Sequence, residues 1–388
     1  MRSLINILTV ISRLFVGILF ILSGLIKAND PLGFGYKLQE YFEVFHIPWL
    51  KDYGTAFAIF ICALEIGLGV ALLIGYRQKL MAWPLLLLIV FFTFLTFYSA
   101  YFNKVTDCGC FGDALHLTPW QSFGKDLILL IPIILIFIRR NNILPLFGPA
   151  PGLSITLLGF GVSTIFSLYC YRHLPVIDFR PFKIGTNIPD AMKMPPGAVT
   201  DSFTTVLKYK NLKTGELKEF NQQNFPWQDT VNWKWDTTIN KKIREGYKTP
   251  IHDFSLTDLN GGDADEKHVK YTKKFLSNPD YSFFLICYDL QKTENNQELM
   301  KKINSFYDEC TKAQIDMIAL SASVPATVDK FKHEQQALYD FYTVDETTLK
   351  TMIRSNPGLM LLKNGTVIAV WHHHDFPTLE EVKQKYFK

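Results

Sequence analysis

Five long apolar runs in the first half of the chain constrain its fold more than any other feature. A helix that crosses a bilayer needs about 20 mostly apolar residues. Runs of that kind lie at residues 4–26, 54–75, 81–102, 122–138 and 153–171. After Tyr171 the composition shifts to Lys, Asp, Glu, Asn and Thr. The sequence therefore predicts a multi-pass helical membrane bundle followed by a water-exposed domain.

The first run is better interpreted as a retained membrane helix than as a secretory signal. It carries Arg13, it lacks a clear cleavage site of small residues, and further apolar runs follow it. The fifth run is diluted by serine and threonine. Whether that run spans the bilayer decides on which side the C-terminal domain lies.

Basic residues in short loops predict the orientation, because such residues stay on the cytoplasmic side. They fall together on one side of the bundle: Arg2, Arg77, Lys79, Arg139 and Arg140. The loops at 29–53 and 103–121 then lie outside, and with five spans so does the C-terminal domain. The net charge of +4 is not gathered into a run. We therefore expect the lipid bilayer, and no nucleic acid, as a partner; the oligomeric state is left open.

Charged residues within or beside the predicted spans include Arg13, Glu65 and Lys27. Charged side chains inside a membrane are functional candidates by default. Arg13 and Glu65 lie at similar depths from the cytoplasmic side, so we expect them to form an ion pair that fixes helix register. The alternative is a polar wall for a buried head group. Lys27 lies at the outer end of the first helix, where we expect its ammonium group to reach the interface.

The segment Asp107-Cys108-Gly109-Cys110-Phe111-Gly112-Asp113 lies in the outer loop at 103–121. A glycine between two cysteines gives the torsional freedom that a small-ring disulfide needs, and strained or exposed disulfides tend to be the labile ones. Such a pair could pass electrons to a lipid-soluble acceptor such as a quinone. A structural disulfide, free thiols, or a metal site with His116 are the alternatives.

Several of these residues belong to one pattern, which runs Arg13, Phe20, Ser23, Gly24, Lys27, Glu65, the segment Asp107 to Asp113, Lys125 and Asp126. Over residues 1–140 the pattern resembles the DoxX-like membrane proteins, and most of all their methylamine-utilisation branch, the MauE proteins. The resemblance implies a four-helix membrane core, to which this chain adds a fifth helix. It also implies a link to disulfide maturation of an exported protein client, with Cys108 and Cys110 as candidate redox thiols. Quinone is the cofactor that the wider group suggests. Candidate binding residues are Arg13, Lys27, Glu65, Asp107 and Asp113.

The rest of the chain divides by composition into three parts. Residues 141–180 are expected to hold the fifth helix and a connector, residues 181–245 a small β-rich insertion, and residues 246–388 an α/β domain. A hairpin is predicted in the insertion around a turn at Lys213-Thr214-Gly215. We expect the tryptophans that follow it to pack against the main domain: Trp227, Trp233 and Trp235.

Strands and helices alternate in the last part. Apolar runs and helical spacing predict strands within 252–261 and at 281–288, 315–320, 359–362 and 366–371, and helices at 296–312, 327–336 and 379–386. This order resembles the thioredoxin fold of membrane-tethered thiol reductases and peroxiredoxin-like proteins. By that resemblance Pro357 stands where the fold carries a cis-proline beside its active site, and is a candidate binding residue.

The sequence departs from the active members of that fold in one respect. They carry Cys-x-x-Cys after the central strand, where a helix N-terminus lowers the thiol pKa. Here the segment is Cys287-Tyr288-Asp289-Leu290, and no second cysteine follows before Cys310. We expect a domain that has lost dithiol exchange and instead binds a peptide, a lipid or a partner through the same groove.

His372, His373 and His374 follow the last predicted strand. Neighbouring residues on a strand point to opposite faces. We therefore expect that the three rings do not converge on a metal, and that they form a solvated strand end.

Two functions remain open from the sequence. The first is a multi-pass protein of the bacterial inner membrane with a periplasmic C-terminal domain, which takes part in thiol–disulfide exchange through Cys108 and Cys110. The second is a non-enzymatic membrane scaffold or sensor, in which the degenerate domain binds a partner and the cysteine pair is structural.

Overall fold

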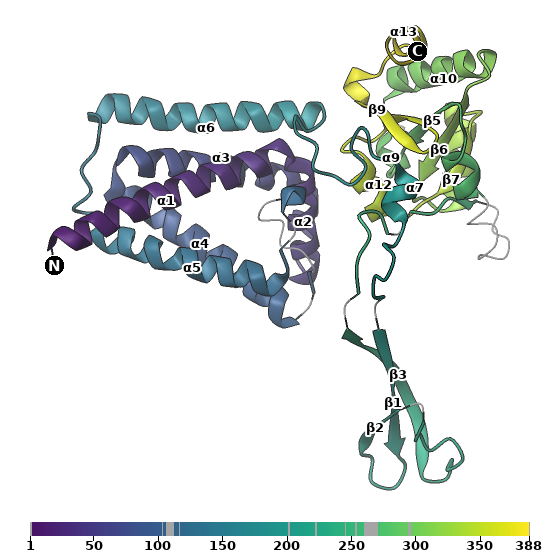
Figure 1. Ribbon diagram of the computed structural model, residues 1–388, viewed down its shortest axis with the longest axis horizontal. Helices are drawn as coiled ribbons and strands as arrows, with labels where there is room; N and C mark the ends of the chain where they lie inside the picture. Colours follow the sequence, from purple (N-terminus) through teal and green to yellow (C-terminus); the bar gives the residue numbers. More distant parts are fainter. Residues whose placement is uncertain are drawn as a thin grey trace. The chain divides into compact units, whose positions relative to one another are not determined.

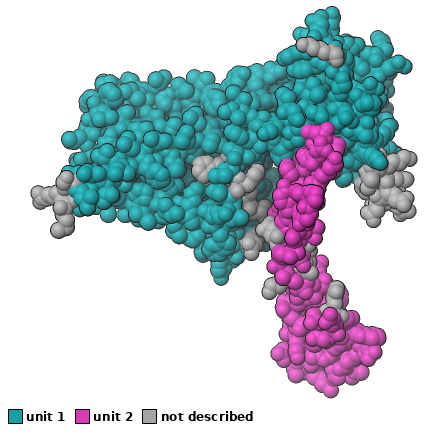
Figure 2. Space-filling model, in the orientation of Figure 1, with its two compact units in different colours: residues 1–186, 254–388 teal, residues 187–253 magenta. Residues whose placement is uncertain are grey.

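The structure is a computed structural model of the chain (Figure 1). It describes residues 2–102, 104–105, 112–115, 117–200, 202–221, 223–244, 246–252, 254–259, 271–293 and 296–387. The chain divides into two compact units, which are residues 1–186 with 254–388, and residues 187–253 (Figure 2). The larger unit holds the apolar helices and an α/β domain.

Among the described residues, five helices are long and apolar enough to cross a bilayer, and they coincide with the five predicted apolar runs. They are α1 (Arg2–Asn29), α3 (Gly54–Ile74), α4 (Gln78–Phe102), α5 (Pro119–Arg139) and α6 (Pro149–Arg172). Large apolar side chains stay exposed on their outer faces, such as Leu87, Ile131 and Ile165, which are 63–71% exposed. Apolar surface of this extent suits lipid rather than water. The chain is therefore a membrane protein.

The segment between the first two spans is a helix rather than the predicted loop. Helix α2 (Pro31–Val44) begins at the N-cap Asp30, whose side chain accepts the main-chain N–H of Gly33. Phe34, Leu38 and Tyr41 follow at helical spacing and are buried. A short 3-10 helix, η1 (Pro48–Tyr53), leads from α2 into α3.

Glycines allow α1 and α3 to approach closely. A Cβ at Gly69 would lie 2.9 Å from the carbonyl oxygen of Gly17, and a Cβ at Gly17 would lie 3.2 Å from that of Gly69. Small residues at such contacts let helix backbones pack directly in a membrane. Helix α6 lies along α3 (Figure 1), where the ring of Phe160 packs on Gly67.

The α/β domain is built on a six-stranded mixed sheet with the order β4-β7-β6-β5-β8-β9. The strands are β4 (Thr257–Asp258), β5 (Tyr281–Ile286), β6 (Asp316–Ser321), β7 (Asp340–Thr343), β8 (Gly358–Lys363) and β9 (Thr366–His372). Strands β5, β6 and β7 are parallel, whereas β8, β9 and β4 each run antiparallel to a neighbour. The apolar run of β5 is central and buried.

The helices beside this sheet include α9 (Leu290–Thr293), α10 (Gln297–Lys312), α11 (Pro325–Gln335), α12 (Glu346–Met352) and α13 (Leu379–Tyr386), and residues 271–276 are also helical. Side chains of α10, α11 and α13 join the core of one face, for example Ile303, Phe331 and Val382 beside Phe283. These bounds confirm the predicted helices and the strands in 281–288, 315–320, 359–362 and 366–371. The strand predicted within 252–261 shrinks to two residues in the described part of that segment. Strand β7 and helix α12 were not predicted, because each is too short to give a clear periodicity.

The smaller unit contains α7 (Ile188–Met192) and a three-stranded antiparallel sheet of order β2-β1-β3. Strands β1 (Ser202–Asn211) and β2 (Leu217–Asn221) confirm the predicted hairpin, and β3 (Trp233–Arg244) pairs with the other edge of β1. The tryptophans are not placed as expected, because two of them are exposed and the third packs on a strand of its own unit. Trp227 and Trp235 are 63% and 56% exposed, and Trp233 packs edge-on against Phe220 inside the unit. A single three-stranded sheet has too few layers to enclose large aromatic rings.

Because α1 and α3 pack closely at Gly69, we expect the stability of the protein to be sensitive to a larger side chain there. Replacing Gly69 with leucine should lower the stability by about 1–3 kcal/mol, because the new side chain must push the carbonyl of Gly17 away. Thermal unfolding in detergent measures the effect. Gly161→Ala is the matched control, since a Cβ there meets nothing within 4 Å. An equal loss in both variants would contradict the close contact.

Candidate functional site

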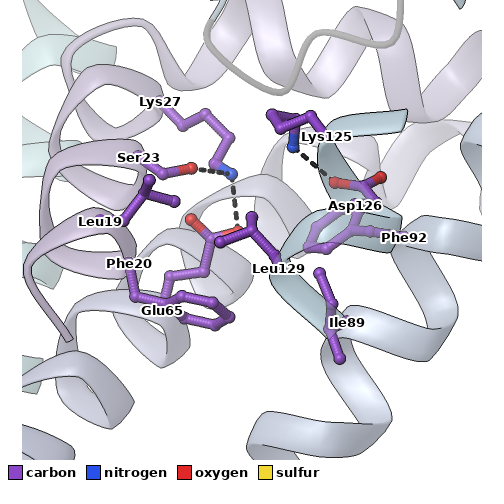
Figure 3. A pocket seen from close by; sticks show the side chains of 10 residues that line it. All are labelled: Leu19, Phe20, Ser23, Lys27, Glu65, Ile89, Phe92, Lys125, Asp126 and Leu129. Carbon is purple, nitrogen blue, oxygen red and sulfur yellow. Dashed lines mark hydrogen bonds and ion pairs between the residues drawn. The ribbon is translucent and has the colours of Figure 1, made fainter. Parts of the chain in front are cut away.

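A pair of oppositely charged side chains lies buried between α1 and α3 (Figure 3). The Lys27 ammonium is 2.6 Å from Glu65 Oε1 and donates to Ser23 Oγ at 2.9 Å. The side chains of Lys27 and Glu65 are only 3% and 4% exposed. The rings of Phe34 and Phe92 lie 5.4 and 5.2 Å from the ammonium nitrogen. The charge is therefore enclosed by one carboxylate, one hydroxyl and two aromatic faces.

A second lysine–carboxylate pair faces the first from α5. Lys125 Nζ lies 2.5 Å from Asp126 Oδ1, and the hydroxyl of Thr96 in α4 donates to Asp126 Oδ2 at 3.0 Å. The Asp126 side chain is 1% exposed. Both pairs line one pocket (Figure 3), together with Leu19, Phe20, Ser23, Ile89, Phe92 and Leu129. The family pattern noted in the sequence thus converges in space at Phe20, Ser23, Lys27, Glu65, Lys125 and Asp126.

The expected pair between Arg13 and Glu65 is wrong. The Arg13 guanidinium donates to the carbonyl oxygen of Leu73, at the end of α3, with a distance of 2.6 Å. Leu73 lies about two helical turns from Glu65, or roughly 12 Å along the axis. Helix α1 extends beyond the end of α3, so depths counted from the two helix ends do not correspond.

The expectation that Lys27 reaches the interface is also wrong. Helix α1 continues to Asn29, and α2 folds back over its end, so Lys27 is enclosed. With Glu65 available at 2.6 Å, the ammonium is compensated within the bundle rather than by water.

One polar atom of the pocket has no hydrogen-bond partner among the described residues. Glu65 Oε2 is buried, and no described residue gives it a hydrogen bond. A buried carboxylate oxygen costs free energy unless it is hydrogen-bonded. The pocket therefore suits a ligand or water that donates a hydrogen bond to this oxygen.

The cysteine pair itself lies outside the described residues, as do Asp107 and His116. The residues that flank the pair are described. Val105 is buried among aromatic side chains, and the 3-10 helix η2 (Gly112–Ala114) follows the loop. Asp113 in η2 lies three residues after Cys110 in the chain. The contacts of Asp113 therefore fix the position of the C-terminal end of the cysteine loop.

Asp113 binds an arginine of the α/β domain. Arg354 Nη2 lies 2.8 Å from Asp113 Oδ2, and Arg354 Nε lies 2.8 Å from Asp30 Oδ2. The guanidinium is 5% exposed. Burial acts to lower the pKa of Arg354, but the charges of Asp30 and Asp113 outweigh it and hold that pKa above its usual value. A permanently charged arginine therefore joins α2, the end of the cysteine loop and the α/β domain.

A tyrosine pair adds a second contact beside this arginine. The hydroxyl groups of Tyr36 in α2 and Tyr288 lie 2.9 Å apart, and the Arg354 guanidinium lies 5.8 Å from the Tyr36 ring. Burial raises the pKa of both phenols, so both are neutral at pH 7 and one can donate to the other.

Pro357 follows Arg354 closely, and the Asn356–Pro357 peptide bond is cis, as expected for that position. The side chain of Asn356 donates to the carbonyl oxygen of Asp289 at 2.7 Å and accepts the N–H of Asp289 at 3.2 Å. The proline loop is therefore tied to the segment after β5, where the sequence lacks a second cysteine. Cys287 in that segment is fully buried, and burial raises its pKa to about 12. It is a packing residue rather than a reactive thiol.

The three histidine rings at the end of β9 were expected to point apart, and this expectation is wrong. A 3-10 turn, η3 (His373–Asp375), interrupts the strand alternation after His372, and one ring nitrogen from each of the three histidines lies within 4.8 Å of the others. Burial and the neighbouring histidines lower the pKa of His372 to about 3 and of His373 to about 4.

Sequence reasoning missed Arg354, Asp30, Tyr36 and Tyr288. Their pairing joins parts of the chain up to 324 positions apart, and a lone arginine before a proline gives no pattern to search for. The N-cap position of Asp30 just before Pro31 was the one available signal, since it marks a helix start.

Comparison with known proteins agrees with the membrane assignment. The family described as methylamine utilisation protein MauE matches residues 5–139, which hold the first four spanning helices. A family described as a domain of unknown function, DUF8463, matches residues 203–245, the three-stranded sheet of the smaller unit.

A curated relative, Protein TlpB of Flavobacterium psychrophilum, is 24% identical over 252 residues. The match covers 61% of this chain and 65% of the relative's length. No solved structure matches this chain.

Because Lys27 and Glu65 are buried together, we expect the stability of the protein to depend strongly on both side chains. Lys27→Met should cost about 3–5 kcal/mol of stability, because it leaves the Glu65 carboxylate buried and unpaired. The double variant Lys27→Met with Glu65→Gln should regain most of that loss. Thermal unfolding in detergent tests both, with Lys37→Met as the control for a partly exposed pair worth at most about 1 kcal/mol. A double variant as unstable as the single one would contradict the pairing.

Proposed function

We propose that this protein carries out thiol–disulfide exchange at the membrane, with Cys108 and Cys110 as its redox pair and an exported protein as its client. The observation that carries the proposal is the contact of Arg354 with Asp113. It ties the end of the cysteine loop to the proline loop of the α/β domain. Similarity to the MauE family over the bundle supports the same assignment.

The α/β domain is, in this proposal, a thioredoxin-like domain without a dithiol of its own. Its parallel β6-β5 pair beside the antiparallel β8-β9 hairpin supports that fold. The proline loop and the segment after β5 together form the edge at which such a domain binds its substrates. Here Tyr288 and Arg354 of that edge contact α2 and η2. We therefore assign the domain to positioning the cysteine loop, while the loop supplies the thiols that act on the client.

The exchange balances with one acceptor. A client with two thiols loses two electrons and two protons and becomes a disulfide, while the Cys108–Cys110 disulfide becomes a dithiol. Reoxidation of the pair passes two electrons and two protons to a lipid-soluble quinone, which becomes a hydroquinone. The pocket lined by Lys27, Glu65 and Lys125 supports this step, since it offers proton donors and a buried carboxylate oxygen with no partner among the described residues.

The topology follows from the positions of the basic residues. We propose that the chain lies in a bacterial inner membrane, with Arg77 and Arg139 on the cytoplasmic side. The cysteine loop and the α/β domain then face the periplasm, where disulfides form and persist.

A scaffold or sensor without redox activity is the second candidate. The burial of Cys287 favours it, because the α/β domain cannot exchange disulfides by itself. In that case Cys108 and Cys110 are a static bridge or free thiols.

Labelling of thiols in intact cells separates the two candidates. The four cysteines that the structure describes are all buried (Cys62, Cys170, Cys287 and Cys310). We therefore expect a membrane-impermeant maleimide to label two sites after mild reductant and none before it. Labelling should fall to one site in Cys108→Ser or Cys110→Ser and stay at two in Cys310→Ser. The serine variants should also lose oxidation of a reduced dithiol peptide in membrane vesicles supplied with a quinone analogue. Full activity in both serine variants would refute the redox proposal.

The arginine contact gives an independent prediction. Arg354→Gln leaves Asp30 and Asp113 without their common counter-charge, so the end of the cysteine loop loses its anchor. We expect peptide oxidation to fall at least tenfold, while both cysteines remain alkylatable after reduction. Lys330→Gln is the control, because Lys330 is an exposed lysine of α11 whose pair with Glu334 lies at the surface. An unchanged rate in Arg354→Gln would show that this contact plays no part in the exchange.

A further inference from the structure

The histidines at the end of β9 form a compact cluster outside the site described above. His372 ends the strand, and His373 and His374 lie in η3, so the turn brings three consecutive rings to one place. Ring centroids lie 4.1–4.9 Å apart. His372 is buried, His373 is half-buried and His374 is exposed. The cluster is therefore anchored in the domain and reachable from solvent.

Two of the rings have a fixed tautomer. His374 Nδ1 lies 2.8 Å from the carbonyl oxygen of Arg172, which can only accept, so Nδ1 carries the hydrogen. His373 Nδ1 lies 3.0 Å from Ser355 Oγ, whose own hydrogen is donated to the carbonyl oxygen of Pro357. The Ser355 oxygen therefore accepts from His373. Both rings leave a lone pair on Nε2.

This arrangement is the one that metal-binding histidines use, since such a ring donates its other N–H to an oxygen that holds it in place. The third ring differs. His372 Nδ1 accepts the main-chain N–H of His374 at 3.2 Å, so its neutral form carries hydrogen on Nε2. It can become a ligand when its ring turns and gives up that hydrogen bond.

We propose that this cluster binds a divalent transition-metal ion such as Zn²⁺, with Nε2 of His373 and His374 as the first two ligands and His372 as the third. Imidazole ligands suit zinc, nickel and copper, whereas magnesium and calcium take oxygen ligands. Zn–N bonds of about 2.0–2.1 Å place the nitrogens of a tetrahedral site roughly 3.4 Å apart. One ring nitrogen of each histidine already lies within 4.8 Å of the others, so small movements of the three side chains can bring one ligand atom of each to that spacing.

The site would also link two parts of the larger unit. Arg172 ends α6, and its neighbour His173 pairs with Asp375 of η3 at 2.7 Å. The ligand His374 is thus held by the last residue of a membrane-spanning helix. A bound metal would fix the end of α6 against the end of β9.

Zinc binding to the purified full chain tests the proposal. The chain carries a purification tag without histidine, and binding is followed by calorimetry and by metal content after dialysis. We expect one Zn²⁺ per chain with a Kd in the micromolar range or tighter. His373→Asn and His374→Asn should each weaken binding at least tenfold, and His372→Asn should weaken it less. His333→Asn, an exposed histidine on α11, should leave binding unchanged.

Absence of stoichiometric zinc, or equal binding in a His373→Asn/His374→Asn double variant, would overturn the proposal. If that variant does not fold, a modification experiment on the wild-type chain replaces it. Zinc should then protect the clustered histidines from modification by diethyl pyrocarbonate while His333 still reacts, and failure to protect them would count equally against the site. Neither outcome depends on the cysteine pair or on the proposed redox activity.

Discussion

A charge buried among apolar helices must find its counter-charge inside the protein, because lipid offers none. Glu65 meets this condition through Lys27 at 2.6 Å, with both side chains almost fully enclosed. The pair requires α1 and α3 to lie in one register, and Gly17 and Gly69 allow the backbone contact that this register needs. Lys125 and Asp126 bring a second pair from α5 to the same pocket. Polar chemistry inside the bundle thus depends on two lysines placed against two carboxylates.

The same stretch of chain connects the pocket with the α/β domain. Asp30 lies three residues after Lys27, where it caps α2 and binds Arg354. Arg354 also holds Asp113, which closes the cysteine loop in sequence. Because a single buried guanidinium serves two carboxylates from separate segments, neither segment can move away without leaving a charge unpaired. The pocket, the start of α2 and the end of the cysteine loop are therefore held by one continuous set of contacts.

The five spans could be predicted from the sequence, because a run of 20 apolar residues has few structural alternatives. Long elements of the α/β domain could be predicted for a similar reason, as with the β8-β9 hairpin around Lys363-Asn364-Gly365. The ion pairs could not be predicted. Depth counted along each helix gave Arg13 as the partner of Glu65, but that count assumes helices of equal extent. Helix α1 begins well before the level at which α3 ends, so Arg13 meets Leu73 and Lys27 meets Glu65. Helix α2 folds over the C-terminal end of α1 and encloses Lys27. Arg354 gave no local signal, since its partners lie in other segments.

The burial of Cys287 limits the roles that the α/β domain can have in thiol–disulfide exchange. Its thiol has a pKa near 12 and no second cysteine beside it, so it forms almost no thiolate at neutral pH. Meanwhile the edge of the domain that contains Tyr288 and Arg354 is engaged by Tyr36, Asp30 and Asp113. A domain that kept an exposed dithiol at this edge would bring a competing redox pair to the end of the cysteine loop. In the proposed exchange, a domain without a dithiol and with a permanently charged arginine at this edge would position thiol chemistry carried by the membrane part.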